Sequence, residues 1–165
     1  MNELEAAIGI GAMEIYEEIL KKRHDNLMYV LNCFNRFPPH LSTIREEAHE
    51  QIDPYTIPII INEEAPFTRA ELTQHLEENG IETRTLFASV PTRCPGFEYL
   101  GYKLSNAEYL GHHGLHIGVH QDVGIEDMEY VLDLLGQFIK ICQNTPQLCW
   151  GDEWPPLSPG GRGLG

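Results

Sequence analysis

Hydrophobic residues recur at helical spacing through the first 37 residues of the chain. Asn2 and Glu5 have the spacing of a capping box, so we expect a helix to begin at Asn2. Pro38 and Pro39 end the pattern. The apolar stripe consists of Ile8, Ile15, Ile19, Leu27, Val30, Leu31 and Phe34. The pattern predicts one long helix from Asn2 to about Phe37.

Two strands and a helix are predicted next. Residues 55–62, YTIPIIIN, are rich in β-branched side chains and predict a strand, in which Pro58 indicates an edge position or a bulge. Thr68 and Glu71 form a second capping box ahead of a helical pattern. Residues 81–87, IETRTLF, predict another strand.

The rest of the chain alternates between loops and regular elements. A Pro- and Gly-rich loop is expected over 88–104 and a short helical turn over 106–111. Apolar and polar positions alternate over 115–120, which is typical of a half-buried strand. Residues 125–142 predict an amphipathic helix. Its core-facing residues are Met128, Val131, Leu132, Leu135, Phe138 and Ile139. Residues 144–165 have the composition of a disordered tail.

These elements define a fold class. A few strands with segregated helices indicate a small α+β layer. The 165 residues suit about one domain, and a hydrophobic content of 42% is that of a globular protein.

Charge and composition exclude several partners. The formal charge of −14 disfavours nucleic acid and anionic membrane surfaces. No apolar run approaches the roughly 20 residues that a membrane-spanning helix needs. The four cysteines form no C-x-x-C pair, and no signal peptide pattern precedes them. We therefore expect reduced thiols and a cytoplasmic location.

Four of the eight histidines lie in LGHHGLHIGVHQDV, residues 110–123. On a strand, His116 and His120 share a face but lie roughly 13 Å apart. That separation is too large for one zinc ion, whose bonds to nitrogen are about 2 Å long. We expect these histidines to be structural, or to lie at the edge of a substrate site, and we expect no metal.

Three segments in order resemble one family. They are MNELEAAIGIGAMEIYEEILKKRHDN, GIETRTLF and GLHIGVHQDVGIEDMEYVLDLLGQFI. They resemble the C-terminal part of the DegT/DnrJ/EryC1/StrS family of pyridoxal-phosphate (PLP) enzymes. Most members are aminotransferases that act on nucleotide-linked keto-sugars, and a few are dehydratases. The resemblance covers about residues 1–143.

The resemblance implies a fold and a domain division. It implies the small C-terminal domain of the aspartate-aminotransferase type, a short sheet with helices packed on one side, preceded by a long linking helix. Residues 1–37 would form the inter-domain helix and residues 38–143 the small domain. Residues 144–165 match nothing in the family and remain the expected tail.

The cofactor lysine of this family lies in a large domain upstream of the matched segments. Schiff-base chemistry needs a lysine amine held neutral by its surroundings. The four lysines here, Lys21, Lys22, Lys103 and Lys140, lie in no matching motif. The resemblance therefore implies PLP in the full-length enzyme, with none held covalently by this chain. We expect no catalytic residue here, and no activity from the chain alone.

Some side chains remain candidates for substrate contact. Arg84 in GIETR matches a recurrent family position near the cleft, and its planar fork suits phosphate or carboxylate. A surface salt bridge is the alternative. Ser89, Thr92 and Arg93 are polar candidates in the following loop. Many members carry a Pro-Leu-His pattern there, where this chain has Val90, Pro91 and Thr92. That departure leaves transamination and dehydration both open.

Two further hypotheses stand beside a piece of a sugar aminotransferase. The chain could be a stand-alone α+β binding or partner module without catalysis, or a histidine-rich metal-binding protein, which strand geometry disfavours. The resemblance implies a nucleotide-sugar substrate and a homodimer.

Overall fold

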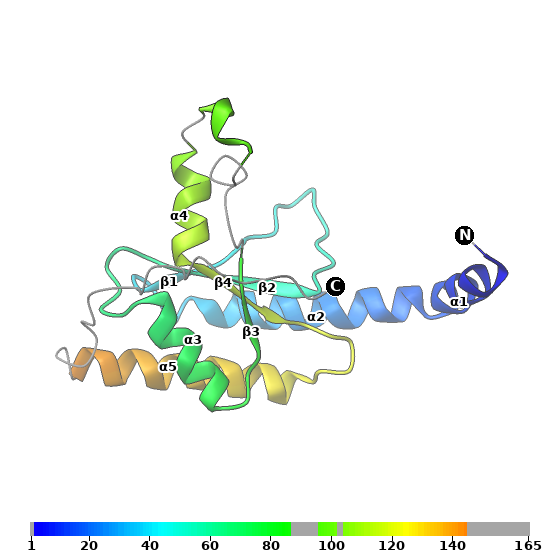
Figure 1. Ribbon diagram of the computed structural model, residues 1–165. Helices are drawn as coiled ribbons and strands as arrows, with labels where there is room; N and C mark the ends of the chain where they lie inside the picture. Colours follow the sequence, from blue (N-terminus) through cyan, green and yellow to red (C-terminus); the bar gives the residue numbers. More distant parts are fainter. Residues whose placement is uncertain (1, 87–95, 102–103, 145–165) are drawn as a thin grey trace.

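The protein is known from a computed structural model that describes residues 2–86, 96–101 and 104–144. The elements run in the order α1 (Glu3–Glu14), α2 (Tyr16–Phe34), β1 (Leu41–Ser42), β2 (Thr56–Ile61), α3 (Arg69–Glu78), β3 (Thr83–Thr85), η2 (Glu98–Leu100), α4 (Ser105–His113), β4 (Gly114–Gly118) and α5 (Ile125–Asn144) (Figure 1). The fold is α+β, as the pattern predicts.

The strands form one antiparallel sheet in the order β1-β2-β4-β3. Pro58 lies beyond the two β2 residues that pair with β1, so the expected edge position is present on the β1 side; the register with β4 continues through it, so the expected bulge is not. Its carbonyl accepts a hydrogen bond from Thr43 Oγ1 at 2.6 Å, so its backbone faces the β1 side. Because β1 pairs only with Ile60 and Ile61, the missing N–H of Pro58 leaves no ladder bond unmade.

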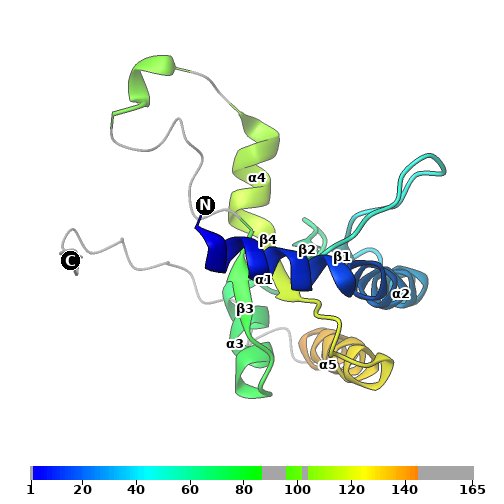
Figure 2. The same cartoon turned by 90° about the vertical axis from the view of Figure 1, so that its right-hand side faces the viewer.

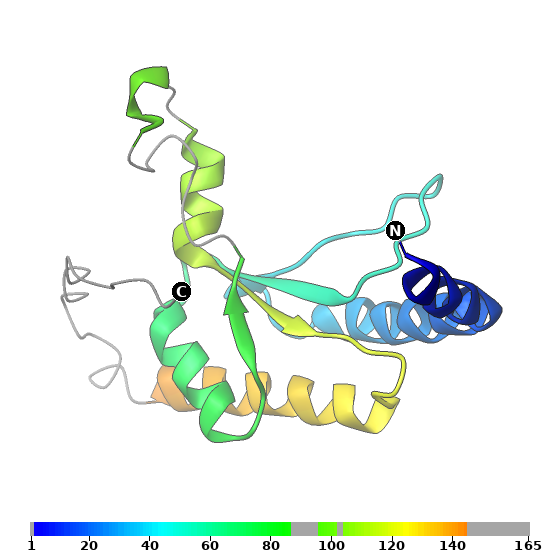
Figure 3. The same cartoon turned by 45° about the vertical axis from the view of Figure 1, so that its right-hand side comes forward.

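Helices α2, α3 and α5 cover one face of this sheet (Figures 1 and 3). Alternate residues of β2, namely Ile57, Ile59 and Ile61, are buried against them, as the two-residue period of a strand requires. The core residues predicted for α5 are all buried, and the helix starts at Ile125 as expected.

The predicted single helix over residues 2–37 is wrong in one respect. Ile15, with φ −109° and ψ 4°, separates α1 from α2, and α2 ends at Phe34. Helix α1 lies at the far end of α2, away from the sheet (Figure 1), and buries no residue. The expected core residues Ile8 and Ile15 are 66% and 53% exposed, so no described core contact holds α1 in line with α2.

Helix α4 rises from the other side of the sheet (Figures 1 and 2). The pattern predicts only a short turn here, yet the helix extends to His113, so His112 and His113 belong to a helix and not to the histidine strand. The hydroxyl of Tyr109 donates to the carbonyl of Ile61 at 3.0 Å and ties α4 to β2. This long-range contact explains why the helix exceeds its local signal.

Both predicted capping boxes are present, at Asn2 with Glu5 and at Thr68 with Glu71. The strand predicted over 81–87 is shorter in the described residues, at Thr83–Thr85. Within the described part of the chain, no helix has the length and apolar character needed to cross a membrane.

Candidate functional site

A row of three side chains crosses the sheet on the face away from α2, α3 and α5. In the antiparallel register, Arg84 of β3 lies opposite His116 of β4, which lies opposite Pro58 of β2. Their strand neighbours Thr83 and Ile117 are buried in the core. Successive side chains of a strand point to opposite faces, so the row lies on the open face of the sheet.

Arg84 is exposed and pairs with Glu82, the residue just before β3. Its Nε and Nη2 donate to Oε1 of Glu82 at 3.1 and 2.6 Å, and the two side chains are 72% and 76% exposed. The surface salt bridge named as the alternative is therefore present. Exposed pairs contribute about 0–1 kcal/mol, so the guanidinium remains exchangeable towards an anionic ligand.

Only one ring nitrogen of His116, Nε2, is available to form a hydrogen bond with a ligand. Its Nδ1 is buried and has no hydrogen-bond partner among the described residues. A buried N–H without an acceptor costs about 1–3 kcal/mol, which favours a proton on Nε2 over one on Nδ1. The side chain next to Arg84 is thus a hydrogen-bond donor through Nε2.

The start of β4 is fixed by Arg69 at the beginning of α3. Its Nη1 donates to the carbonyls of Gly111 at 2.6 Å and Gly114 at 3.5 Å, which satisfies carbonyls at the end of α4. Burial lowers the pKa of the Arg69 guanidinium. A Cβ at Gly114 would lie 2.5 Å from the Leu110 carbonyl oxygen and 2.9 Å from Leu86 Cδ2, so only glycine fits.

His113 stacks on Tyr109 beside this junction, with ring centroids 4.4 Å apart. Burial lowers the pKa of His113, the charges of His112 and Arg69 lower it further, and Glu63 opposes them. Burial raises the pKa of Tyr109, and so do nearby carboxylates. Near neutral pH this corner of the sheet therefore carries an uncharged imidazole and an uncharged phenol.

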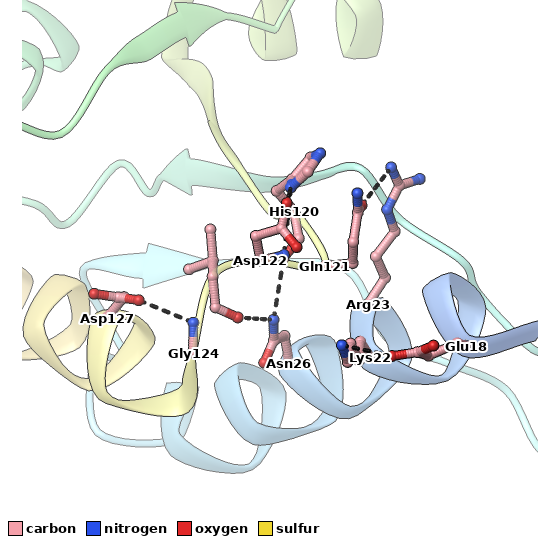
Figure 4. Close-up of polar contacts among 10 residues, drawn as sticks. Glu18, Lys22, Arg23, Asn26, His120, Gln121, Asp122, Gly124 and Asp127 are labelled. Atoms are coloured by element: carbon pink, nitrogen blue, oxygen red, sulfur yellow. Dashed lines mark hydrogen bonds and ion pairs between the residues drawn. The ribbon is translucent and has the colours of Figure 1, made fainter. Parts of the chain in front are cut away.

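The other end of β4 is held by Asn26 of α2 (Figure 4). Its buried amide donates to the carbonyls of His120 at 3.4 Å and Val123 at 2.8 Å. Next to it, Arg23 Nη2 donates to Gln121 Oε1 at 3.2 Å. The sequence reading missed Asn26, although a polar residue directly before Leu27 in the apolar stripe was a usable signal.

The histidines do not converge. His112 and His113 end α4, His116 lies on β4, and His120 lies in the following turn, where its Nδ1 is 3.2 Å from Asp122 Oδ2. The described ranges hold no group of three side chains that could bind a metal ion.

The remaining predicted site residues separate into two groups. Ser89, Thr92 and Arg93 lie outside the described residues, as does Lys103. Lys21 pairs with Asp25 at 2.7 Å and Lys22 with Glu18 at 2.8 Å, both exposed. The hydrogen bond to Glu18 raises the pKa of Lys22, the opposite of what Schiff-base formation needs. Neither Lys21 nor Lys22 therefore fits covalent PLP.

Solved structures identify the class of this fold as that of PLP-dependent sugar aminotransferases and dehydratases. The Escherichia coli GDP-4-keto-6-deoxy-D-mannose-3-dehydratase with bound hydrated PLP matches with a TM-score of 0.66 and 26% identity, over 78% of this chain and 34% of that one. PseC of Helicobacter pylori, an aminotransferase, matches with a TM-score of 0.75 over 86% and 38% of the two chains; at 14% identity it supports the fold alone.

The chain belongs to the DegT/DnrJ/EryC1/StrS aminotransferase family, whose model matches residues 1–136. Curated relatives include the lipopolysaccharide biosynthesis protein RfbH of Salmonella typhimurium, 28% identical over 84% of this chain and 32% of its own length. The GDP-4-keto-6-deoxy-D-mannose 3-dehydratase of Yersinia pseudotuberculosis is 29% identical over 81% and 34%. The chain thus spans about a third of the length of the curated relatives it matches. The relatives that have been solved with PLP confirm the expected cofactor for the full-length enzymes.

Proposed function

We propose that this chain is the C-terminal part of a PLP-dependent enzyme that acts on a nucleotide-linked keto-sugar, and that the reaction is a 3-dehydration rather than a transamination. One observation carries the choice of reaction. Among the curated relatives at 26–29% identity, those from Yersinia pseudotuberculosis, Saccharopolyspora spinosa and Escherichia coli are named as 3-dehydratases of keto-sugars. Family membership favours this origin over a stand-alone binding module.

The part assigned to this chain is recognition of the substrate on the open face of the sheet. Arg84 supplies an exposed planar cation, and Nε2 of His116, on the neighbouring strand directly opposite, supplies a hydrogen-bond donor. A phosphate or carboxylate oxygen held by both would replace Glu82 as the partner of Arg84. Ser89, Thr92 and Arg93, which follow β3 in the chain, remain proposed contacts.

The cofactor and its lysine would come from other segments of the enzyme. PLP supplies the electron sink for the reaction when bound. The chain alone is therefore proposed to be inactive. Its full-length form is proposed to be a homodimer in the cytoplasm, as the family resemblance implies.

A chimera tests this proposal. Residues 2–144 would replace the corresponding C-terminal third of the Yersinia pseudotuberculosis 3-dehydratase, and dehydration of GDP-4-keto-6-deoxy-D-mannose would be assayed with PLP. We expect measurable dehydratase activity, and roughly 10–100-fold lower kcat/KM after Arg84→Ala, the loss expected for one charge-assisted contact of about 1.5–3 kcal/mol.

Arg45→Ala, at an exposed arginine in the loop before β2, is the matched control and should leave kcat/KM unchanged. A folded chimera without activity would contradict the assigned family role. An active chimera that tolerates Arg84→Ala would contradict only the role of Arg84. Turnover by the 165-residue chain alone would contradict the proposed inactivity.

A further inference from the structure

The sheet ends at β3, whose outer side we refer to as the β3 edge. Strand β3 is last in the order β1-β2-β4-β3, and among the described residues it pairs with β4 alone. Helix α3 does not cover this edge, because a hollow separates Thr85 from outer residues of α3 that include Ala70, Thr73 and Gln74. Unpaired backbone groups at such an edge are a template for a further strand.

One hydrogen bond establishes which residues of β3 face the β3 edge. The N–H of Leu86 donates to the carbonyl of Gly114 at 3.2 Å, and these two residues lie opposite each other when the register of β3 with β4 is continued. Bonded and non-bonded pairs alternate along an antiparallel ladder, so Arg84 also directs its backbone groups towards β4. Thr83 and Thr85 direct theirs outwards.

The neighbouring strands support this assignment. The carbonyl of Pro58 faces β1, away from the opposite residue His116. The backbone groups of His116 therefore face β3, where Arg84 is its partner in the register. The β3 edge thus offers the N–H and C=O groups of Thr83 and Thr85 to a strand that lies beside it.

The charges that flank Thr83 are self-complementary. Glu82 and Arg84 have opposite charges and exposed side chains. If a second copy pairs antiparallel with Thr83 opposite Thr83, Glu82 of each copy lies opposite Arg84 of the other. A pair centred on Glu82 or on Arg84 would place like charges opposite each other, and one centred on Thr85 would place Arg84 opposite Leu86. The charge pattern therefore favours one register.

We propose that the β3 edges of two copies of this chain pair antiparallel around a two-fold axis at Thr83, which joins their two four-stranded sheets into one continuous sheet. The N–H of Thr83 donates to the Thr83 carbonyl of the other copy, and the N–H of Thr85 donates to the Ile81 carbonyl. The N–H of Ile81 takes no part, because it donates to the carbonyl of Leu76 at 2.9 Å within its own chain.

The pairing also changes the partner of Arg84. Opposite residues of a non-bonded antiparallel pair have Cα atoms about 4.5 Å apart, whereas residues two apart on one strand are separated by roughly 6.6 Å. Glu82 of the other copy is therefore closer in backbone position than Glu82 of the same chain. Arg84 can exchange one for the other, so no ion pair is lost when the two edges meet.

The net charge of the chain determines the conditions of the test. The formal charge of −14 on each copy opposes association at low salt. At about 0.15 M ionic strength, exposed charges more than about 8 Å apart are largely screened, whereas the contacts of Glu82 with Arg84 across the pair are shorter. The pairing should therefore be measured at this ionic strength.

Amide exchange with water, measured by NMR on the full chain, reports on the β3 edge directly. We expect the amides of Thr83 and Thr85 to exchange roughly four-fold more slowly at about 1 mM than at about 20 μM, for a dissociation constant of about 100 μM, because only the free edge exchanges. The amide of Arg84, which faces β4, should exchange equally at both concentrations. Association through another surface would not single out Thr83 and Thr85.

Charge reversals test the register. Arg84→Glu alone or Glu82→Arg alone places like charges opposite each other and should abolish the concentration dependence. The double exchange of Glu82→Arg with Arg84→Glu restores opposite charges and should restore the dependence. Lys21→Glu, which reverses an exposed charge of α2, is the matched control and should leave the dependence unchanged.

A proline tests the backbone bonds. Thr85→Pro removes an N–H that faces outwards, so it leaves the ladder with β4 intact and should abolish the concentration dependence at Thr83. Thr85→Val retains the N–H and the branched side chain, and should behave as the parent chain does. Circular dichroism and the melting temperature would verify that each variant folds.

Equal exchange of Thr83 and Thr85 at both concentrations, at the rate of an open edge, overturns the proposal. So does protection that neither dilution nor a single charge reversal removes, because the same chain then covers the edge. Concentration-dependent protection that survives both single charge reversals would overturn the pairing around Thr83.

Discussion

The buried amide of Asn26 joins α2 to the turn between β4 and α5. The amide is 5% exposed and reaches two carbonyls that lie 94 and 97 positions further along the chain. One side chain therefore holds two elements that have no local reason to meet.

Asn26→Ala should lower the free energy of unfolding by about 1–3 kcal/mol, because two carbonyls in the turn after β4 lose the buried amide that donates to them. Urea denaturation followed by circular dichroism would measure this loss. Asn32→Ala, at an exposed position of the same helix, is the control and should change the value by less than about 0.5 kcal/mol. Equal effects of the two substitutions would remove the special role given to Asn26.

Gly114 carries a steric requirement that Gly118, at the other end of the same strand, lacks. Gly114→Ala should destabilise the fold by about 1–3 kcal/mol, since its Cβ would overlap the backbone oxygen of Leu110. Gly118→Ala has open space and should be close to neutral. Melting temperatures of the two variants would show the difference, and a neutral Gly114→Ala would mean that the end of α4 moves freely.

At the scale of elements, α4 ends at His113, beside Tyr109 and Arg69, the two groups that attach α4 to the rest of the fold. The folded state lowers the pKa of His113, so the unfolded state binds a proton more readily at mildly acidic pH. The contribution of His113 is complete above its unfolded pKa of about 6.5 and is lost as the pH falls below that value. Burial is the largest cause of the lowered pKa, the charges of His112 and Arg69 lower it further, and Glu63 opposes them.

His113→Phe keeps the stack on Tyr109 and removes the titration. The fall in unfolding free energy between pH 7 and pH 5, measured in urea, should be smaller in this variant than in the parent chain. The control is His49→Gln, at a histidine with an 82% exposed side chain, which should retain the parent pH dependence. A His113 pKa at or above that of His49, measured by NMR, would refute this account.

The elements also show which kinds of information the sequence holds. The capping boxes at Asn2 and Thr68 are signals four residues long, and both were predictable. The two-residue strand β1 forms only because β2 lies beside it, and the pairing of Arg84 with His116 depends on strands 32 positions apart. Such long-range pairings have no local signature, so the family resemblance suggested Arg84 whereas the role of His116 required the fold.

At the scale of the whole molecule, α1 carries four large apolar side chains that are exposed in the described structure. The side chains of Leu4, Ile8, Ile10 and Met13 are between 66% and 71% exposed. Exposed apolar surface of this kind promotes association. The proposed assignment to the C-terminal third of a longer enzyme gives this helix a covering surface in the intact protein.

The chain should self-associate as its concentration rises, and the double substitution Ile8→Gln with Ile10→Gln should shift it towards monomer. Sedimentation velocity over a roughly 100-fold range of concentration would measure the change, because weak apolar association has micromolar to millimolar dissociation constants. Tyr55→Gln removes a comparably exposed side chain, 72% exposed, away from α1 and should have no effect. Monomeric behaviour of the parent chain throughout would contradict a role for α1 in association.

The strand order β1-β2-β4-β3 has a consequence for how the protein is made. Strands β2 and β3 leave the ribosome before β4, yet they share no ladder with each other and meet only through β4. The sheet therefore cannot grow hairpin by hairpin during synthesis. Its two halves wait for residues 114–118, and the buried faces of α2 and α3 wait for α5, so a nascent chain stopped before that point exposes its apolar strands to chaperones and proteases.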